Sequence, residues 1–116
     1  MSLPYRLTAV PSSTEDELYR VDLDGEHAIF GGHFPGNPVL PGVYMLDMVK
    51  RVLEDKARAH VHFTELIRCK FMQPVRPTLP QPELTLHVLT PSSGRVEASL
   101  LQDGVVAFKL TASYRA

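Results

Sequence analysis

The sequence predicts an α+β protein in which one long helix is wrapped by an antiparallel β-sheet. Residues 43–59 contain no proline or glycine and carry apolar side chains at helical spacing, whereas from residue 63 onward apolar residues recur at every second position. A single buried helix followed by a run of strands favours a sheet folded around that helix. At 116 residues we expect one domain, 1–116, with a modest core.

The elements follow in order. Residues 18–24 place Tyr19, Val21 and Leu23 on one side of a half-buried strand that Asp24-Gly25 ends. A proline- and glycine-rich segment then leads to the helix. The first two helical turns are apolar nearly all round and the second half is charged. A helix that is apolar on every side at one end is expected to be enclosed there by other structure.

The second half of the chain alternates with period two. We expect strands around 63–71, 83–88, 96–100 and 106–114, and the pair Asp103-Gly104 predicts a hairpin turn between the last two. Four prolines, at 74, 77, 80 and 82, separate the first of these strands from the second. Cys69 lies on the apolar face of its strand, which favours a packed thiol over a nucleophile.

Composition excludes several classes of function. The chain is 44% apolar and 22% charged with a formal charge of −1, which gives no reason to expect nucleic acid or an anionic membrane as partner. One cysteine suits a reducing compartment, and no apolar run has the length of a signal segment or a membrane span. We therefore expect a cytoplasmic protein, and one this small is more easily stabilised as an oligomer.

Two polar residues in the stretch GGHFPGNPVLPGVYMLDMV, residues 31–49, raise a chemical question. Asp47 lies among apolar helical residues, where an ionised carboxylate is costly unless it is paired. It is either half of a structural ion pair with Arg or Lys, or a catalytic acid or base whose pKa the apolar setting raises. His33 either caps a backbone group or serves as a base.

The segment between them favours catalysis. Pro35, Pro38 and Pro41 restrict the backbone, while Gly36 and Gly42 permit close approaches, so the connector fixes His33 relative to the helix start. The N–H of Gly42 has no helical partner at that position and could polarise a carbonyl or hold an enolate oxygen. One short segment thus offers a base, an oxyanion donor and a carboxyl group.

The pattern His33-Phe34-Pro35-Gly36-x-Pro38-x-x-Pro41-Gly42-Val43, followed by Asp47, resembles the signature of the 3-hydroxyacyl-acyl carrier protein dehydratases of fatty-acid synthesis. Lys70-Phe71-x-x-Pro74-Val75-x-Pro77 also resembles the strand that follows their central helix. The resemblance covers the chain from about residue 24 onward.

This resemblance implies a hotdog fold, with the long helix wrapped by a highly curved antiparallel sheet. It implies catalytic roles for His33, Asp47 and the backbone N–H of Gly42, with no metal and no organic cofactor. Two subunits would pair so that each active site takes His33 from one and the acid from the other, and three such dimers could assemble further into a trimer of dimers. Substrate contacts are then expected from Phe34, Pro35, Gly36, Pro41, Val43 and Tyr44.

The carrier protein is acidic, and its contacts are expected among Arg68, Lys70 and Arg76, although solvated surface charges explain each of them equally well. His60 and His62, two apart near a strand start, lack a third ligand at suitable spacing for a metal site. His27 and His87 look like surface or edge residues.

The sequence departs from the family in two places. Pro77-Thr78-Leu79-Pro80 replaces the usual Pro-Gly-Asp, and the His-Arg-Tyr-Pro-type segment of the housekeeping dehydratases is missing. A compact dehydratase suits core fatty-acid synthesis or a specialised pathway such as polyene synthesis. The alternatives are a hotdog thioesterase, a non-catalytic subunit that pairs with an active partner, and a coenzyme A hydratase, whose Asp usually precedes its His.

Overall fold

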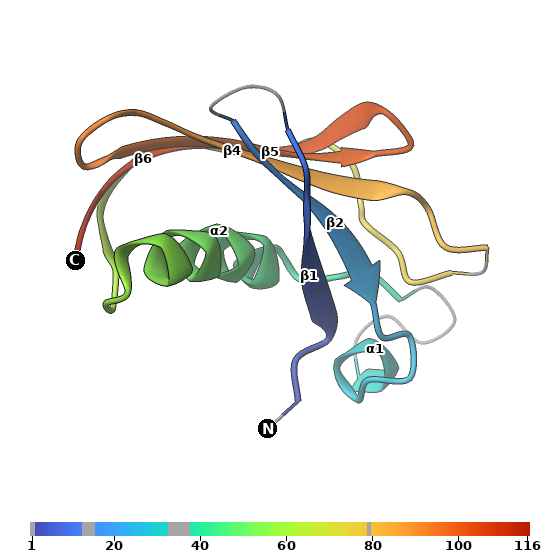
Figure 1. The fold of residues 1–116 in the computed structure, drawn as a ribbon. Coiled ribbons are helices and arrows are strands. Elements are labelled where there is room, and N and C mark those ends of the chain that lie inside the picture. Colours follow the sequence, from blue (N-terminus) through green and yellow to red (C-terminus); the bar gives the residue numbers. More distant parts are fainter. Residues whose placement is uncertain (1, 13–15, 33–37, 79) are drawn as a thin grey trace.

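One antiparallel sheet and one long helix make up the protein. The computed structural model describes residues 2–12, 16–32, 38–78 and 80–116. Six strands form the sheet in the order β1-β2-β4-β5-β6-β3, and α2 lies along its concave face (Figure 1). The elements are β1 (Tyr5–Val10), β2 (Glu17–Leu23), α1 (Ile29–Gly32), α2 (Gly42–Ala57), β3 (His62–Phe71), β4 (Leu84–Ser92), β5 (Arg95–Gln102) and β6 (Val105–Arg115).

The core lies between α2 and the sheet. Met48 and Val49 of the helix are fully buried, as are Leu100 and Phe108 of β5 and β6, and the same cluster includes side chains from every other strand except β3. The alternation in strands β4, β5 and β6 sends every second side chain into this core. The predicted α+β arrangement is therefore confirmed.

The backbone conformation of a few residues explains the hairpin turn between β5 and β6 and the end of α2. Asp103 and Gly104 have φ of 51° and 81°, the left-handed pair that a two-residue hairpin requires, so the predicted turn between β5 and β6 is confirmed. The helix ends at Ala57, two residues before the predicted end, because Arg58 adopts φ 53° and donates its N–H to the Glu54 carbonyl at 2.8 Å.

Two elements were not predicted. Strand β1, which pairs with β2 from Tyr5↔Leu23 to Val10↔Leu18, and the single-turn α1 are absent from the sequence-based interpretation. In β1 the alternation of more and less buried side chains is limited to the first residues, and Thr8, Ala9 and Val10 are all exposed. Its pairing with β2, and not its own pattern, defines it as a strand.

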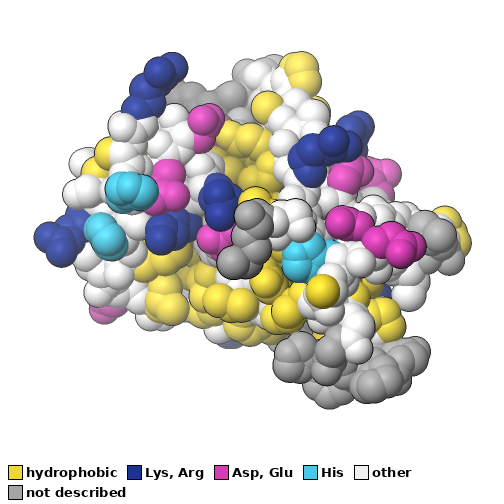
Figure 2. Space-filling view, turned by 90° about the horizontal axis from the view of Figure 1, so that it is seen from below, with side chains coloured by type: hydrophobic (Ala, Val, Ile, Leu, Met, Phe, Trp, Pro, Cys, Tyr) yellow, Lys and Arg dark blue, Asp and Glu magenta, His cyan; other side chains and the backbone are white. Residues whose placement is uncertain are grey.

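The prediction that the start of α2 is enclosed is wrong for the single chain. Val43 is 65% exposed, and Figure 2, which views α2 from the side away from the sheet, shows a hydrophobic area bordered by charged and histidine side chains. The alternation in 63–71 predicted an apolar face, and two residues of that face, Ile67 and Phe71, are exposed in β3. Two features of the fold account for these differences: β3 is an edge strand, and the sheet covers only one side of the helix (Figure 1).

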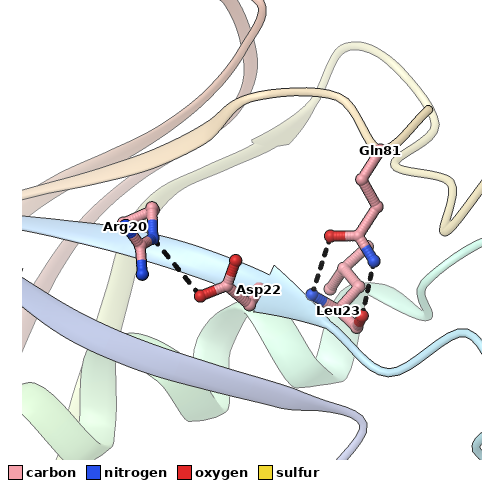
Figure 3. Close-up of polar contacts among 4 residues, drawn as sticks. All are labelled: Arg20, Asp22, Leu23 and Gln81. Carbon is pink, nitrogen blue, oxygen red and sulfur yellow. Dashed lines mark hydrogen bonds and ion pairs between the residues drawn. The ribbon is translucent and has the colours of Figure 1, made fainter. Parts of the chain in front are cut away.

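Hydrogen bonds at two places join segments that are far apart in the sequence. Leu40 donates its N–H to the Val75 carbonyl at 2.7 Å, which joins the residues before α2 to those after β3. The amide of Gln81 accepts from the Leu23 N–H at 3.3 Å and donates to the Leu23 carbonyl at 2.6 Å (Figure 3). Arg20 and Asp22, 3.3 Å apart, form a surface ion pair on the same strand. Of these contacts, the Leu40–Val75 bond anchors the chain just before α2.

Helix–sheet packing should dominate the stability of the domain. Met48→Ala removes a side chain with 0% exposure, so we expect a loss of about 2–5 kcal/mol in the free energy of unfolding, measured by urea denaturation. Met72→Ala, the matched change at a side chain that is 46% exposed, should alter it by about 0.5 kcal/mol or less. Equal losses in the two variants would contradict this account of the core.

Candidate active site

The first turn of α2 offers a backbone donor. Pro41 is the N-cap, with extended backbone (φ −60°, ψ 141°) and no side-chain cap, and its carbonyl accepts the Tyr44 N–H at 3.0 Å. The N–H of Gly42 has no backbone acceptor among the described residues. A helix N-terminus combines such unpaired N–H groups with the positive end of the dipole, so this position suits an oxyanion or a polarised carbonyl.

An apolar pocket of about 350 Å³ opens beside Gly42. The Phe71 ring packs so closely there that a Cβ on Gly42 would lie 2.6 Å from its Cε1 and 2.7 Å from its Cζ. A glycine is therefore required as long as Phe71 keeps this position. The lining comes from the segment before α2, the helix, and the end of β3 with the residues after it: Val39, Leu40, Gly42, Met45, Phe71, Met72, Gln73 and Pro74.

Asp47 lies in a second pocket, of about 430 Å³, which also includes Val43, Tyr44, His27 and Arg51. Its Oδ2 accepts hydrogen bonds from the Tyr5 hydroxyl at 2.5 Å and from Arg51 Nε at 2.8 Å. Its side chain is 31% exposed. The carboxylate is thus paired on the helix, and one edge of it faces accessible space.

The expected rise in the pKa of Asp47 does not occur. Burial raises the pKa, but hydrogen bonds from Tyr5 and Arg51, together with the charges of Arg51 and Lys50, outweigh it, so the pKa lies below its usual value. Burial and then the Asp47 contact raise the pKa of Tyr5, which keeps its hydroxyl a donor. In the single chain Asp47 is an ionised acceptor, and the ion-pair interpretation holds for it.

Gly42 and Asp47 do not converge on one pocket within the chain. They are five positions apart on the helix, which places them about 140° apart around the axis, and each lines a different pocket. Val43 and Tyr44 lie with Asp47, whereas Pro41 precedes both pockets as the cap. The predicted oxyanion donor and acid are therefore brought to the same end of α2 but to different sides of it.

Four predicted residues, His33, Phe34, Pro35 and Gly36, lie outside the described residues. The histidine that the described chain places in the Asp47 pocket is His27, which was predicted to be a surface residue. Its Nδ1 accepts the Ile29 N–H at 3.1 Å and its Nε2 lies 3.0 Å from the Ser2 carbonyl, so both ring nitrogens are used in holding the backbone. This is a structural role.

Sequence reasoning missed Tyr5 and Arg51. Arg51 follows Asp47 by four residues, a spacing that predicts an ion pair on a helix, so this partner could have been found. Tyr5 is 42 residues away from Asp47, and no local pattern connects them.

The predicted basic residues lie on and after β3. Arg68 and Lys70 are two apart and share a face of the strand, where Lys70 pairs directly with Lys109 of β6. Lys109 and Arg68 line one shallow pocket with Glu97. Arg76, in the segment after β3, has a buried Nε with no hydrogen-bond partner among the described residues. The strand thus carries a cationic face that also includes Lys109.

His60 and Cys69 lie outside the two pockets beside α2. His60 Nδ1 lies 3.5 Å from Glu54 Oε2, and within the part of the chain that the structure describes no three His, Cys, Asp or Glu side chains gather as metal ligands would. Cys69 is partly buried, and burial raises the pKa of its thiol, as for a packed thiol. Over the same residues, no helix has the length and apolarity to cross a bilayer.

Solved structures with the same architecture identify the fold. The dehydratase heterocomplex ApeI:P from Xenorhabdus doucetiae superimposes with a TM-score of 0.77 at 20% identity, covering 96% of this chain and 99% of that one. An uncharacterised protein from Erwinia carotovora superimposes with a TM-score of 0.65 at 22% identity. The predicted hotdog fold is confirmed.

Sequence comparison then gives the family. A model of the ApeI-like family, described as ApeI dehydratase, matches residues 10–108, so the chain belongs to the ApeI-like dehydratase family. It is 33% identical over 99 residues to the 3-hydroxyacyl-[acyl-carrier-protein] dehydratase FabZ of Latilactobacillus sakei, covering 78% of this chain and 70% of that protein. With FabZ of Campylobacter hominis it shares 39% over 59 residues, 42% of this chain and 41% of the relative. The chain thus spans under half the length of some of the relatives it matches.

The contact between Gly42 and Phe71 can be tested by a double-mutant cycle. Gly42→Ala should reduce the free energy of unfolding in the native background and should be neutral or stabilising in a Phe71→Ala background, with a coupling of about 1–3 kcal/mol. Gly31→Ala, where a Cβ would meet nothing within 4 Å, is the control and should behave alike in both backgrounds. The same cost for Gly42→Ala with and without the Phe71 ring would show that the ring does not restrict this position.

Proposed function

We propose that this protein dehydrates a (3R)-3-hydroxyacyl thioester, carried by acyl carrier protein, to the trans-2-enoyl thioester. The observation that carries the proposal is the start of α2, where a member of a dehydratase family presents a Gly42 N–H with no backbone acceptor among the described residues and a carboxylate at Asp47. The apolar pocket beside Gly42 offers room for part of an acyl chain. Its single cysteine is in keeping with a cytoplasmic enzyme.

The reaction removes one proton from C2 and the hydroxyl from C3. In the proposed mechanism the Gly42 N–H binds the thioester oxygen and stabilises the enolate that forms, as an oxyanion donor does. His33 takes the C2 proton, and Asp47 assists the departure of the 3-hydroxyl as water. No metal ion or organic cofactor is required, because the thioester carbonyl itself makes the C2 proton acidic.

We further propose that two copies of the chain pair to complete each site. Three observations support pairing: the exposed start of α2 at Val43, the edge strand β3 with its exposed apolar side chains, and the separation of Gly42 from Asp47 around the helix. A partner packed against this side of α2 would bring its own helix start beside Asp47. His33 of one subunit would then act with Asp47 of the partner subunit.

Carrier recognition is proposed for the cationic face of β3. Arg68 and Lys70, joined by Lys109, present three cations on one surface, and like charges directly opposite in a sheet are unfavourable. Glu97 lines the same pocket as Arg68 and Lys109 and offsets part of this charge, and an acidic carrier protein would offset more of it. Arg76 follows β3, and because its Nε is buried, only its other guanidinium nitrogens are candidates for a carrier contact. The pathway is then fatty-acid synthesis or the assembly of a specialised acyl chain such as a polyene.

Two other functions have an observation in their favour. An ionised Asp47, to whose Oδ1 no described residue donates, could activate water, which is the chemistry of a hotdog thioesterase. A structural neighbour is a heterocomplex, which is in line with a subunit that works only with a different partner. A turnover assay separates these from a dehydratase, because a thioesterase releases free thiol and a subunit of this kind turns over neither way.

The first measurement is turnover. Purified protein with a 3-hydroxyacyl thioester should form the conjugated enoyl thioester, followed by its absorbance. His33→Ala and Asp47→Asn should each reduce kcat/KM by about 10²–10⁴-fold, because each removes a positioned acid–base or orienting group. His62→Ala and Asp55→Asn, matched changes at exposed positions, should retain the native rate. Free thiol without enoyl product would identify a thioesterase instead.

A shared site can be tested by mixing subunits. In a dimer of one His33→Ala chain and one Asp47→Asn chain, one of the two sites receives both native residues. A random mixture of the two inactive variants should therefore recover about a quarter of the native activity after subunit exchange. Tagged heterodimers, purified through both tags, should reach about half. No recovery in a confirmed heterodimer would place both residues of a site on the same chain.

A further inference from the structure

The carboxylate of Asp47 is held at one oxygen. Tyr5 and Arg51 both donate to Oδ2, and no described residue donates to Oδ1. A carboxylate has about four acceptor positions, so the second oxygen keeps its capacity for a ligand. Because Asp47 also lines a pocket, that capacity is accessible.

The two donors differ in rigidity. The Tyr5 ring is 5% exposed and belongs to the core, and its strand pairs with β2 along six residues. Arg51 is about half exposed on the same helix as Asp47, where an ion pair is screened and its long side chain moves. Tyr5 is therefore the fixed point against which the carboxylate is oriented. The hydroxyl also reaches Asp47 from a strand that forms the opposite edge of the sheet from β3.

We propose that Tyr5 is a positioning residue for Asp47: with Arg51 it holds Oδ2 and leaves Oδ1 to accept a hydrogen bond from the 3-hydroxyl of the substrate. This inference rests on the proposed dehydratase function. It assigns Asp47 the role of an acceptor that orients the C3–O bond, and it assigns to β1 a part in the active site.

The elimination balances without a proton from Asp47. His33 takes the C2 proton, and the electron pair of the C2–H bond becomes the C2=C3 bond. The C3–O bond breaks with its pair on oxygen, and the proton held by His33 completes the water. Asp47 stays ionised throughout the reaction.

The charges around Asp47 determine the expected pH dependence. Lys50 and Arg51 lie on α2, Tyr5 reaches it from β1, and His27 shares the pocket from the turn before α1. Burial raises the pKa of Asp47, and the Tyr5 hydrogen bond is the largest opposing contribution. Removing the Tyr5 hydroxyl raises this pKa, so the carboxylate of Asp47 becomes protonated at higher pH. The rate profile does not isolate this titration, because the base His33 must also be neutral, so the carboxyl group is observed directly.

The first test is the kinetics of Tyr5→Phe, which keeps the buried ring. We expect kcat to fall on the order of 10- to 100-fold with little change in KM. Tyr19→Phe is the matched control, because it also removes a hydroxyl that donates to a carboxylate, Glu17, at 3.1 Å. Its kcat and KM should equal those of the native protein. Arg51→Gln, which removes the other donor to Oδ2, should also lower kcat and replaces Tyr5→Phe if that variant melts below the assay temperature.

A second readout does not depend on turnover. The ¹³C carboxyl signal of Asp47, assigned by its loss in Asp47→Asn, should titrate at higher pH in Tyr5→Phe than in the native protein. An unchanged midpoint, or a midpoint that moves in His27→Gln and not in Tyr5→Phe, would overturn the assignment. A native protein that turns over no 3-hydroxyacyl thioester would instead overturn the proposed function, while the titration would still decide what Tyr5 does.

Discussion

The packing of α2 against the concave face of the sheet is the contact on which the rest of the structure depends. Fully buried Met48 and Val49 hold the helix there, and the Leu40–Val75 hydrogen bond fixes where it begins. The positions of Gly42 and Asp47 both depend on where the helix begins. Because the helix is rigid, the N–H of Gly42 and the carboxylate of Asp47, five positions further along, keep a constant separation.

The sheet covers only one side of this helix, and the site is built on the side it leaves open. Asp47 would be an isolated charge on that surface if Tyr5 and Arg51 did not donate to it. The same two donors that stabilise the ionised carboxylate bind only its Oδ2, and within the described ranges no residue donates to Oδ1. The two hydrogen bonds therefore lower the free-energy cost of the charge on Asp47 and still leave the carboxylate accessible from the pocket.

This arrangement leaves apolar side chains exposed to water in the single chain. Val43 on the helix and Phe71 on β3 are more than half exposed in the single chain, although both are the kind of residue that folding normally removes from water. An edge strand with such side chains is a template for pairing. The hydrophobic area on the open side of α2 (Figure 2) is thus the physical reason to consider a second copy of the chain as part of the site.

The sequence by itself determined the long helix, the strands from β3 to β6, the Asp103-Gly104 turn and the family, because these depend on local periodicity and on a contiguous motif. It also contained the Asp47–Arg51 pair at helical spacing. Only the tertiary structure decided that β1 is a strand, that Tyr5 reaches Asp47, and that the pKa of Asp47 is lowered and not raised. Those outcomes depend on side chains brought together from residues 42 apart, and the chain fold alone creates that proximity.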